Sequence, residues 1–146
     1  MNADPSNEGS RAEARRLRVL IAEDDRDSAA SLQALVELDG HETRCVHRGR
    51  EVVGAARDFG CDVVLLDIGM PGISGYDIAR IFRKTYGSAK PMLIAVTAWN
   101  KSSDRLMAKA AGFDHHFGKP YDAKQLLAVL NDLTTEAVTD TASPSA

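Results

Sequence analysis

Carboxylates follow two of the short apolar runs in this chain. Glu23 and Asp24 come directly after the run Arg18–Ala22, and Asp67 comes directly after the run Val63–Leu66. Carboxylates that meet from two neighbouring strands repel one another, and burial raises their pKa values unless a cation joins them. If the two runs are adjacent strands, the sequence therefore predicts a cation-binding site at their ends.

Magnesium is the cation that fits such a site best. Mg²⁺ prefers oxygen ligands, keeps several of its waters and typically takes one or two carboxylates together with a phosphate oxygen. Ca²⁺ would need more ligands than these residues supply. A Mg²⁺ ion between Asp24 and Asp67 would also neutralise the charge that develops on a phosphoryl group during its transfer. We therefore predict Mg²⁺ as the cofactor and phosphoryl transfer as the chemistry.

Three side chains would complete the machinery for such a transfer. Asp67 is the predicted nucleophile, because the apolar run before it fixes its backbone while its side chain emerges at the edge of the sheet. Lys119 offers a compact positive charge to one phosphoryl oxygen, and Thr97 can donate a hydrogen bond to another. Phosphoryl transfer needs mainly positioning and charge stabilisation, which this set provides.

Each of these residues has a simpler interpretation when it is taken alone. An Asp at a strand end is commonly a turn or cap residue, and the acidic run from Glu23 to Asp25 could begin a helix. Thr97 could be an ordinary strand residue, and Lys119 could be a solvated surface group. Their occurrence at successive strand ends, in the types that one reaction needs, favours the functional interpretation.

Apolar runs alternate with amphipathic stretches in the centre of the chain, a pattern typical of a parallel sheet with helices on both faces. The predicted strands are Arg18–Ala22, Thr43–His47, Val63–Leu66, Met92–Thr97 and His115–Gly118. The predicted helices are Asp27–Leu38, Glu51–Phe59, Tyr76–Tyr86, Ser103–Ala111 and Asp122–Leu133. They predict an α/β fold, a flavodoxin-like doubly wound parallel sheet of five strands in the order 2-1-3-4-5 with five helices. In such sheets ligands bind beyond the carboxyl ends of the strands, where the candidate residues lie.

The composition is that of one globular domain, with 146 residues, of which 44% are hydrophobic and 27% charged. The net charge of −3 and the scattered basic residues give no electrostatic case for nucleic-acid binding. No apolar run approaches the ~20 residues of a membrane span. The N-terminus lacks the apolar centre of a secretory signal, and two cysteines make neither a disulfide framework nor a metal quartet. We therefore expect a cytoplasmic protein without nucleic-acid or membrane partners.

The two ends of the chain differ from its centre. Both are rich in small polar residues and have too little apolar surface to offset the entropy of ordering. We expect a disordered or weakly helical tail over residues 1–16, a single domain over residues 17–135, and a disordered tail over residues 136–146.

Four segments resemble the receiver domains of response regulators, which accept phosphoryl groups in two-component signalling and phosphorelays. These segments are VLIAEDDRD, VVLLDIGMPGISGYD, IAVTA and AGFDHHFGKPYD, and the resemblance covers residues 17–133. It implies that Asp67 is the phospho-acceptor and that Glu23 and Asp24 form the acidic pair around Mg²⁺. The backbone carbonyl of Gly69 would complete the protein ligands of the metal.

The same resemblance implies further roles and partners. Thr97 and Lys119 would sense the phosphoryl group, and a cis peptide bond would join Lys119 to Pro120. A histidine kinase or a histidine phosphotransfer protein would dock against the helix Asp27–Leu38 and donate the phosphoryl group. The chain would be no enzyme apart from Mg²⁺-dependent self-phosphorylation and autodephosphorylation. Its output would be binding to a downstream protein or onward phosphoryl transfer. The chain would be a monomer or a weak dimer.

The chain departs from this family at several positions. Glu23 stands where most members have Asp, and its longer side chain could reach the metal through a water. His116 stands where many members carry an aromatic switch residue, and we expect it to be a surface residue. Gly69 offers no side chain that could orient an attacking water, and Trp99 is bulky enough to cover the phosphoryl group. We therefore expect slow hydrolysis of the phosphoaspartate.

Three other functions fit the sequence less well. A phosphatase of the haloacid-dehalogenase kind needs a second Asp two residues after the nucleophile, where this chain has Gly69. A flavin- or nucleotide-binding module needs Gly, Ser or Thr after its first strand, where this chain has EDDRD. A degenerate receiver that acts only as an interaction scaffold is disfavoured, because the acceptor, the acids, the Thr and the Lys are all present.

Few residues follow Leu133, which predicts a stand-alone receiver without an output domain. The segment AGFDHHFGKP also resembles the receivers attached to hybrid histidine kinases, so an excised fragment of such a kinase stays open.

Overall fold

Five parallel strands form one sheet in the order β2-β1-β3-β4-β5 at the centre of the computed structural model. The structure describes residues 16–88 and 90–142, with residues 135–142 described by their backbone alone. The strands are β1 (Arg18–Ala22), β2 (Glu42–Val46), β3 (Val63–Leu66), β4 (Met92–Thr97) and β5 (His115–Gly118). The helices are α2 (Arg26–Leu38), α3 (Val52–Phe59), α4 (Gly75–Tyr86), α5 (Ser102–Ala111) and α6 (Ala123–Ala142), and a 3-10 turn, η1 (Gly49–Glu51), precedes α3. The predicted fold class and strand order are confirmed.

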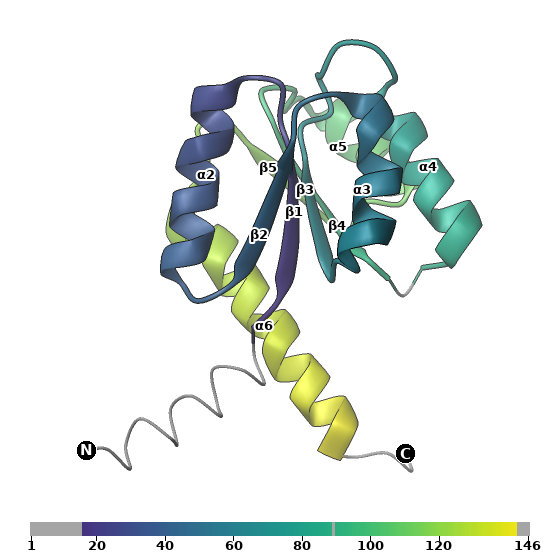
Figure 1. Ribbon diagram of the computed structural model, residues 1–146. Coiled ribbons are helices and arrows are strands. Elements are labelled where there is room, and N and C mark those ends of the chain that lie inside the picture. Colours follow the sequence, from purple (N-terminus) through teal and green to yellow (C-terminus); the bar gives the residue numbers. More distant parts are fainter. Residues whose placement is uncertain (1–15, 89, 143–146) are drawn as a thin grey trace.

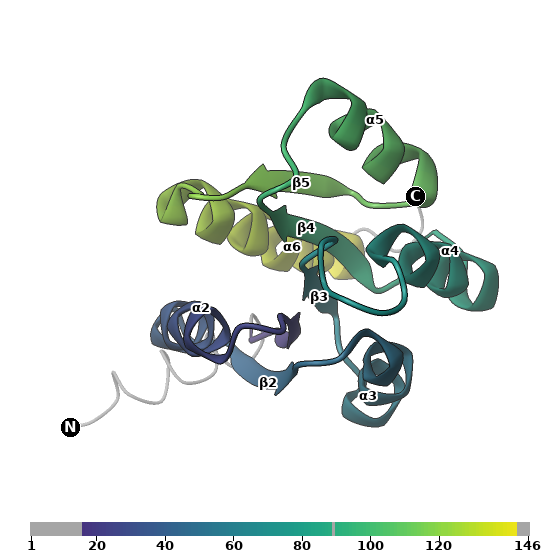
Figure 2. The same cartoon turned by 90° about the horizontal axis from the view of Figure 1, so that it is seen from above.

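Helices cover both faces of the sheet. Helices α2 and α6 lie on one face, and α3, α4 and α5 lie on the other (Figures 1 and 2). Each face has its own apolar core, one built around Phe82 of α4 and the other around Val36 of α2 and Leu130 of α6. The central strands β1, β3 and β4 are buried on both faces, which explains why their sequences are continuous apolar runs rather than alternating ones.

The strand register sets the level at which each strand ends. Ala22, the last residue of β1, pairs with Val46 of β2 on one side and with Leu66 of β3 on the other. Glu23 and Asp67 directly follow these paired residues. The two carboxylates predicted to bind a cation therefore leave the sheet at the same level from adjacent strands.

Most predicted element boundaries agree with the structure to within a residue, but the last helix does not. Helix α6 continues to Ala142 and extends beyond the sheet (Figure 1), where we expected a disordered tail from residue 136. The sequence has no Gly or Pro between Asp122 and Pro144. Because helix propagation is far easier than nucleation, a helix that is anchored by packing can extend through a stretch without such residues. Residues 143–146, and residues 1–15 of the expected N-terminal tail, lie outside the described residues.

A buried histidine fastens the start of β1 at the end of the sheet opposite the candidate site. The backbone N–H of Leu17 donates a hydrogen bond to Nδ1 of His41 at 3.2 Å. Nδ1 must therefore be unprotonated, and Nε2 carries the proton and lies 3.7 Å from Asp39. Burial lowers the pKa of His41, although the charge of Asp39 opposes this shift.

Acidification should destabilise the fold through His41. The unfolded side chain takes up a proton near its usual pKa of about 6.5, whereas the folded side chain resists it. Stability is therefore fully present above this pH and is lost as the pH falls below it, by at most about 1.4 kcal/mol per pH unit. His41→Asn places an oxygen near the position of Nδ1 and does not titrate. Urea denaturation between pH 7.5 and 5.5 should show a smaller pH dependence for this variant, and equal dependence in both proteins would refute the prediction.

Candidate functional site

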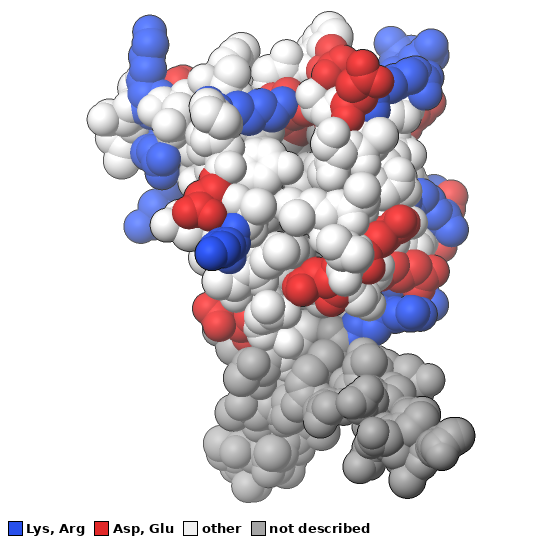
Figure 3. All heavy atoms as spheres, turned by 90° about the vertical axis from the view of Figure 1, so that its left-hand side faces the viewer, with Lys and Arg blue, Asp and Glu red and all other residues white. Residues whose placement is uncertain are grey.

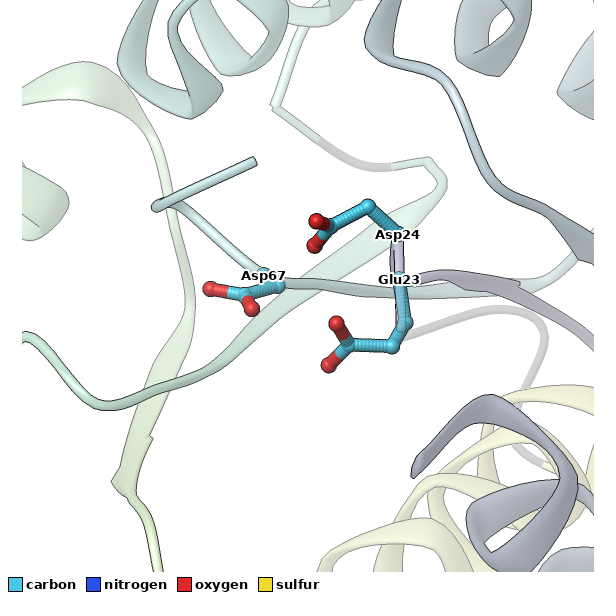
Figure 4. A group of neighbouring side chains, drawn as sticks. All are labelled: Glu23, Asp24 and Asp67. Carbon is cyan, nitrogen blue, oxygen red and sulfur yellow. The ribbon is translucent and has the colours of Figure 1, made fainter. Parts of the chain in front are cut away.

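Three carboxylates converge at the carboxyl ends of β1 and β3. Glu23 and Asp24 extend from the end of β1 to the same side as Asp67, which follows β3 (Figure 4). Each residue offers one oxygen, and these three oxygens lie within 4.8 Å of one another. Glu23 is buried, Asp67 is half-buried and Asp24 is exposed. The structure therefore brings together the acidic residues that the sequence singled out.

The spacing of these oxygens fits a small divalent cation. Opposite ligands of an octahedral Mg²⁺ ion lie about 4.2 Å apart, twice the usual metal–oxygen distance. The oxygens of the three carboxylates, which lie within 4.8 Å of one another, are close to this separation. Because Asp24 is exposed, rotation of its side chain can bring its oxygen nearer to the other two. A set of carboxylate oxygens with open positions is also the donor chemistry that Mg²⁺ prefers.

Lys119 bridges two of the three carboxylates. Its Nζ lies 2.5 Å from Oε1 of Glu23 and 3.2 Å from Oδ2 of Asp67. The other oxygen of Glu23, Oε2, accepts a hydrogen bond from the backbone N–H of Asp25 at 3.1 Å. The longer side chain of Glu23 thus reaches Lys119 directly, a contact that the sequence did not predict.

The charges in this cluster shift the pKa values of the groups that share it. Burial raises the pKa of Glu23, and the hydrogen bonds from Lys119 and Asp25 offset this only in part. Burial would lower the pKa of Lys119, but its hydrogen bond to Glu23 and the charge of Asp67 outweigh burial and raise it. Lys119 therefore stays charged near neutral pH. One ammonium faces three carboxylates, which leaves the site with an excess of negative charge that a cation can neutralise.

The third acidic residue after β1 has a different role. Asp25 is the N-cap of α2, and its carboxylate accepts hydrogen bonds from the backbone N–H of Ser28 at 3.1 Å and from its hydroxyl at 2.5 Å. The simple interpretation of the acidic run, as the start of a helix, is therefore correct for Asp25. Glu23 and Asp24 remain free of this capping task.

Asp67 is fixed from both its backbone and its side chain. Its N–H donates to the carbonyl of Ala22 at 3.0 Å, and its Oδ1 accepts from the N–H of Gly69 at 2.9 Å. The chain after it turns tightly into α4 because Gly75 lies against Ile68, and a Cβ at Gly75 would be 2.6 Å from the Ile68 Cα. A glycine is thus required where the loop after Asp67 meets the helix.

Thr97 and Trp99 border the site on the β4 side. Thr97 is fully buried, and its hydroxyl accepts a hydrogen bond from the backbone N–H of Trp99 at 3.1 Å. The indole of Trp99 lies against Gly69, so that a Cβ at Gly69 would be 3.2 Å from its Nε1. The bulky ring thereby occupies space beside Asp67 that a side chain at position 69 would otherwise take.

His116 is not the surface residue that we expected. It is half-buried, and both of its ring nitrogens are buried. Burial, together with the charge of Arg105 on α5, lowers its pKa. The short sequence of β5 does not reveal this burial, which depends on the packing of α5 against the strand. The peptide bond between Lys119 and Pro120, which follow β5, is cis, as the resemblance implied.

One further contact to the acidic residues was not predictable from the sequence. Nδ1 of His47, the residue after β2, lies 2.9 Å from the backbone carbonyl of Glu23. No motif marks a histidine at this position, because the contact depends on where β2 leaves the sheet.

A cavity of about 380 Å³ opens beside Asp67 and Lys119 on the side of α2. Polar residues of α2, among them Asp27, Ser28 and Ser31, line it together with Tyr121, which follows the cis proline. The candidate nucleophile is therefore accessible from this side.

None of the described helices is long and apolar enough to cross a membrane. Burial raises the pKa of the Cys61 thiol to about 12, which disfavours the thiolate near neutral pH.

Comparisons with known proteins agree with this geometry. The family model of the response regulator receiver domain matches residues 19–131. Protein PilH of Pseudomonas aeruginosa is 32% identical over 114 residues, which are 78% of this chain and 94% of that protein. The uncharacterized transcriptional regulatory protein YkoG of Bacillus subtilis is 34% identical over 110 residues, which are 75% of this chain but 47% of that protein. The chain thus spans about half the length of some curated relatives that it matches.

Solved structures give the same fold. The receiver domain of the Francisella response regulator 1452 superimposes with a TM-score of 0.76 over 84% of this chain and 99% of that one, at 24% sequence identity. The family model covers most of the chain, and the acidic cluster lies at the edge of the sheet where the family's motifs predicted it. The chain therefore belongs to the family of response regulator receiver domains.

Proposed function

We propose that the chain accepts a phosphoryl group on Asp67 from a histidine kinase or a histidine phosphotransfer protein. The observation that carries this proposal is the contact of Lys119 with Asp67 at 3.2 Å, next to the carboxylates of Glu23 and Asp24. A nucleophilic carboxylate, a fixed positive charge and a set of metal ligands are the parts that phosphoryl transfer requires. The cytoplasm is the proposed location of this reaction.

The proposed reaction proceeds by in-line attack. A carboxylate oxygen of Asp67 forms the new bond to phosphorus while the bond between phosphorus and the donor's imidazole nitrogen breaks, and the imidazole leaves. Lys119 pairs with a phosphoryl oxygen during the transfer. Mg²⁺, held by Asp24 and Asp67 with Glu23 and the carbonyl of Gly69 as further proposed ligands, would supply charge neutralisation at this site. Autodephosphorylation by water would then reset the acceptor.

The proposed output is a protein contact near α5, or onward phosphoryl transfer in a relay. A phosphoryl dianion on Asp67 would attract the hydroxyl of Thr97, which now accepts from the N–H of Trp99 at 3.1 Å. Movement of Thr97 would therefore release the segment that leads into α5. Trp99, Leu106 and Met107 are 48%, 70% and 48% exposed there, an apolar surface suited to a protein partner. We also propose that the chain is a monomer or a weak dimer.

Phosphorylation itself is the first test. We expect a histidine phosphotransfer domain that carries labelled phosphate to label the wild type in Mg²⁺, and we expect no label on Asp67→Asn or in the presence of a chelator. Trp99 fluorescence should change when Mg²⁺ and then beryllofluoride are added, and Asp67→Asn should lose the second change. Asp77→Asn, which removes an exposed acid of α4, should behave as the wild type. Equal labelling of wild type and Asp67→Asn would refute the proposal.

The lifetime of the phosphoaspartate is the second test. The indole beside Gly69 should restrict the approach of water to the acyl phosphate, because a Cβ at Gly69 would already lie 3.2 Å from Nε1 of Trp99. We expect loss of label from the wild type over minutes or longer. Trp99→Ala should accelerate this loss about tenfold, equivalent to ~1.4 kcal/mol of barrier, whereas Trp99→Phe should retain most of the protection. A wild-type half-life of seconds would rule out slow hydrolysis.

The proposed docking site for the phosphoryl donor is the outer face of α2. Ala30, Ala34 and Leu38 follow one another at helical spacing on this face, and all are exposed. The charged side chains on this side of the molecule are scattered around a stretch that carries none (Figure 3). Ser31 of the same helix lines the cavity that leads to Asp67. Small and apolar residues exposed on a helix beside the acceptor support contact with a helical phosphotransfer partner.

A variant of this face should separate docking from chemistry. Ala34→Arg adds bulk and charge without harming the helix, so it should slow phosphoryl transfer from the protein donor at least about tenfold, the equivalent of ~1.4 kcal/mol. Labelling by a small phosphoramidate, which needs no docking surface, should stay within about twofold of wild type. Thr85→Arg, on an exposed position of α4 across the sheet, serves as the control. Equal loss with both donors, or no loss with either, would contradict docking on α2.

A further inference from the structure

The pairing of β1 with β2 ends at the point where the acidic residues begin. Ala22 pairs with Val46 as the last pair of the register, and the N–H of Glu23 still donates to the carbonyl of Val46 at 3.1 Å. The chain then leaves the sheet, because Arg48 is the N-cap of η1. In a parallel ladder the carbonyl of Glu23 would accept its next hydrogen bond from the backbone of β2.

The imidazole of His47 takes the place of that backbone donor. Its Nδ1 lies 2.9 Å from the carbonyl oxygen of Glu23. A carbonyl can only accept, so Nδ1 must carry the proton. This hydrogen bond comes from a side chain at the end of the strand, and a substitution can therefore remove it without changing any backbone hydrogen bond of the sheet.

With this contact, all four polar groups of Glu23 are held. Its N–H is bonded to Val46, its carbonyl to His47, its Oε1 to Lys119 and its Oε2 to the N–H of Asp25. A rotation of the peptide unit after Glu23 would move its carbonyl and, through the shared peptide plane, the adjacent backbone of the next acidic residue. The His47 hydrogen bond opposes this rotation.

The same turn also contacts the loop that follows the acceptor. Gly49, two residues after His47, lies against Ile73, and a Cβ at Gly49 would be 2.6 Å from Cγ2 of Ile73. Ile73 belongs to the segment that connects Asp67 to α4. The turn of residues 47–49 therefore contacts both acid-bearing loops, one through a hydrogen bond and the other through close packing.

We propose that His47 is a positioning residue for the metal-binding acids, which it holds through the backbone carbonyl of Glu23. This inference rests on the proposed function, because it assigns His47 a role in the same site. It predicts that the hydrogen-bond donor at this position, and not the imidazole ring or its charge, sets how well the site binds Mg²⁺.

The test compares two nearly isosteric substitutions. His47→Asn places an amide nitrogen close to where Nδ1 stands, whereas His47→Leu places a methyl group there. Mg²⁺ affinity is measured on the unphosphorylated protein by titration with the metal alone, followed by Trp99 fluorescence. We expect His47→Leu to bind Mg²⁺ about fivefold more weakly, the effect of one typical hydrogen bond, and His47→Asn to stay within about twofold of wild type.

The controls separate positioning from folding. Urea denaturation should show that both variants are folded under the conditions of the titration. If His47→Leu does not fold, His47→Gln replaces it, because its amide nitrogen lies one bond too far from the backbone and should also weaken Mg²⁺ binding. His115→Leu removes an exposed imidazole from β5 and should not affect Mg²⁺ affinity.

Each outcome bears on a different claim. Weaker binding in His47→Leu with rescue in His47→Asn supports the positioning role. Equal Mg²⁺ affinity in all variants, or an equal loss of affinity in the Asn and Leu variants, overturns the positioning role. The proposed function stays intact in that case if the wild type is phosphorylated normally. A wild type that shows neither Mg²⁺ binding nor labelling of Asp67 overturns both.

Discussion

Mutual repulsion among three carboxylates is the constraint that the functional edge of this domain must satisfy. Oxygens of Glu23, Asp24 and Asp67 lie within 4.8 Å of one another, and burial makes the ionisation of Glu23 still more costly. Lys119 relieves part of this repulsion by contacting two of the three acids. Because Lys119 follows the edge strand β5 while the acids follow β1 and β3, the relief depends on the correct assembly of the whole sheet.

The rest of the architecture fixes the positions of these charges. Parallel strands with apolar residues on both faces can be fully buried between two helical layers, and their carboxyl ends then share one edge. The short connections at this edge are held by local contacts of each chain segment. Asp25 caps α2, Gly69 donates to Asp67, and Gly75 allows α4 to begin against the residue after the acceptor. The charged site therefore lies on backbone that has little freedom to relax away from the repulsion.

The sequence predicted the fold and the convergence of the acids because both follow from periodicity and connectivity. A short apolar run such as Val63–Leu66, set between helical patterns, favours a buried strand, and the residue after it is then expected at the edge of the sheet. Contacts that depend on side-chain reach between strands distant in sequence were not predictable. The pairing of Glu23 with Lys119 and the hydrogen bond of His47 are of this kind. The burial of His116 depends on how α5 covers β5, and the length of α6 depends on the absence of a stop signal rather than the presence of a pattern.

Because residue 23 is Glu rather than Asp, its carboxylate belongs to the candidate metal site and also contacts Lys119. In the unphosphorylated protein Oε1 of Glu23 holds Lys119, and Oε2 is bonded to the backbone of the same loop, so a metal ion at Glu23 would compete with these partners. A phosphoryl dianion on Asp67 would compete with Glu23 for Lys119 and, having the greater charge, would prevail. The carboxylate of Glu23 would then lose its cationic partner while remaining buried, which is the condition under which a carboxylate most favours a metal ion. On the proposed function, phosphorylation and tighter cation binding would therefore support each other through the exchange of Lys119 between two oxygens.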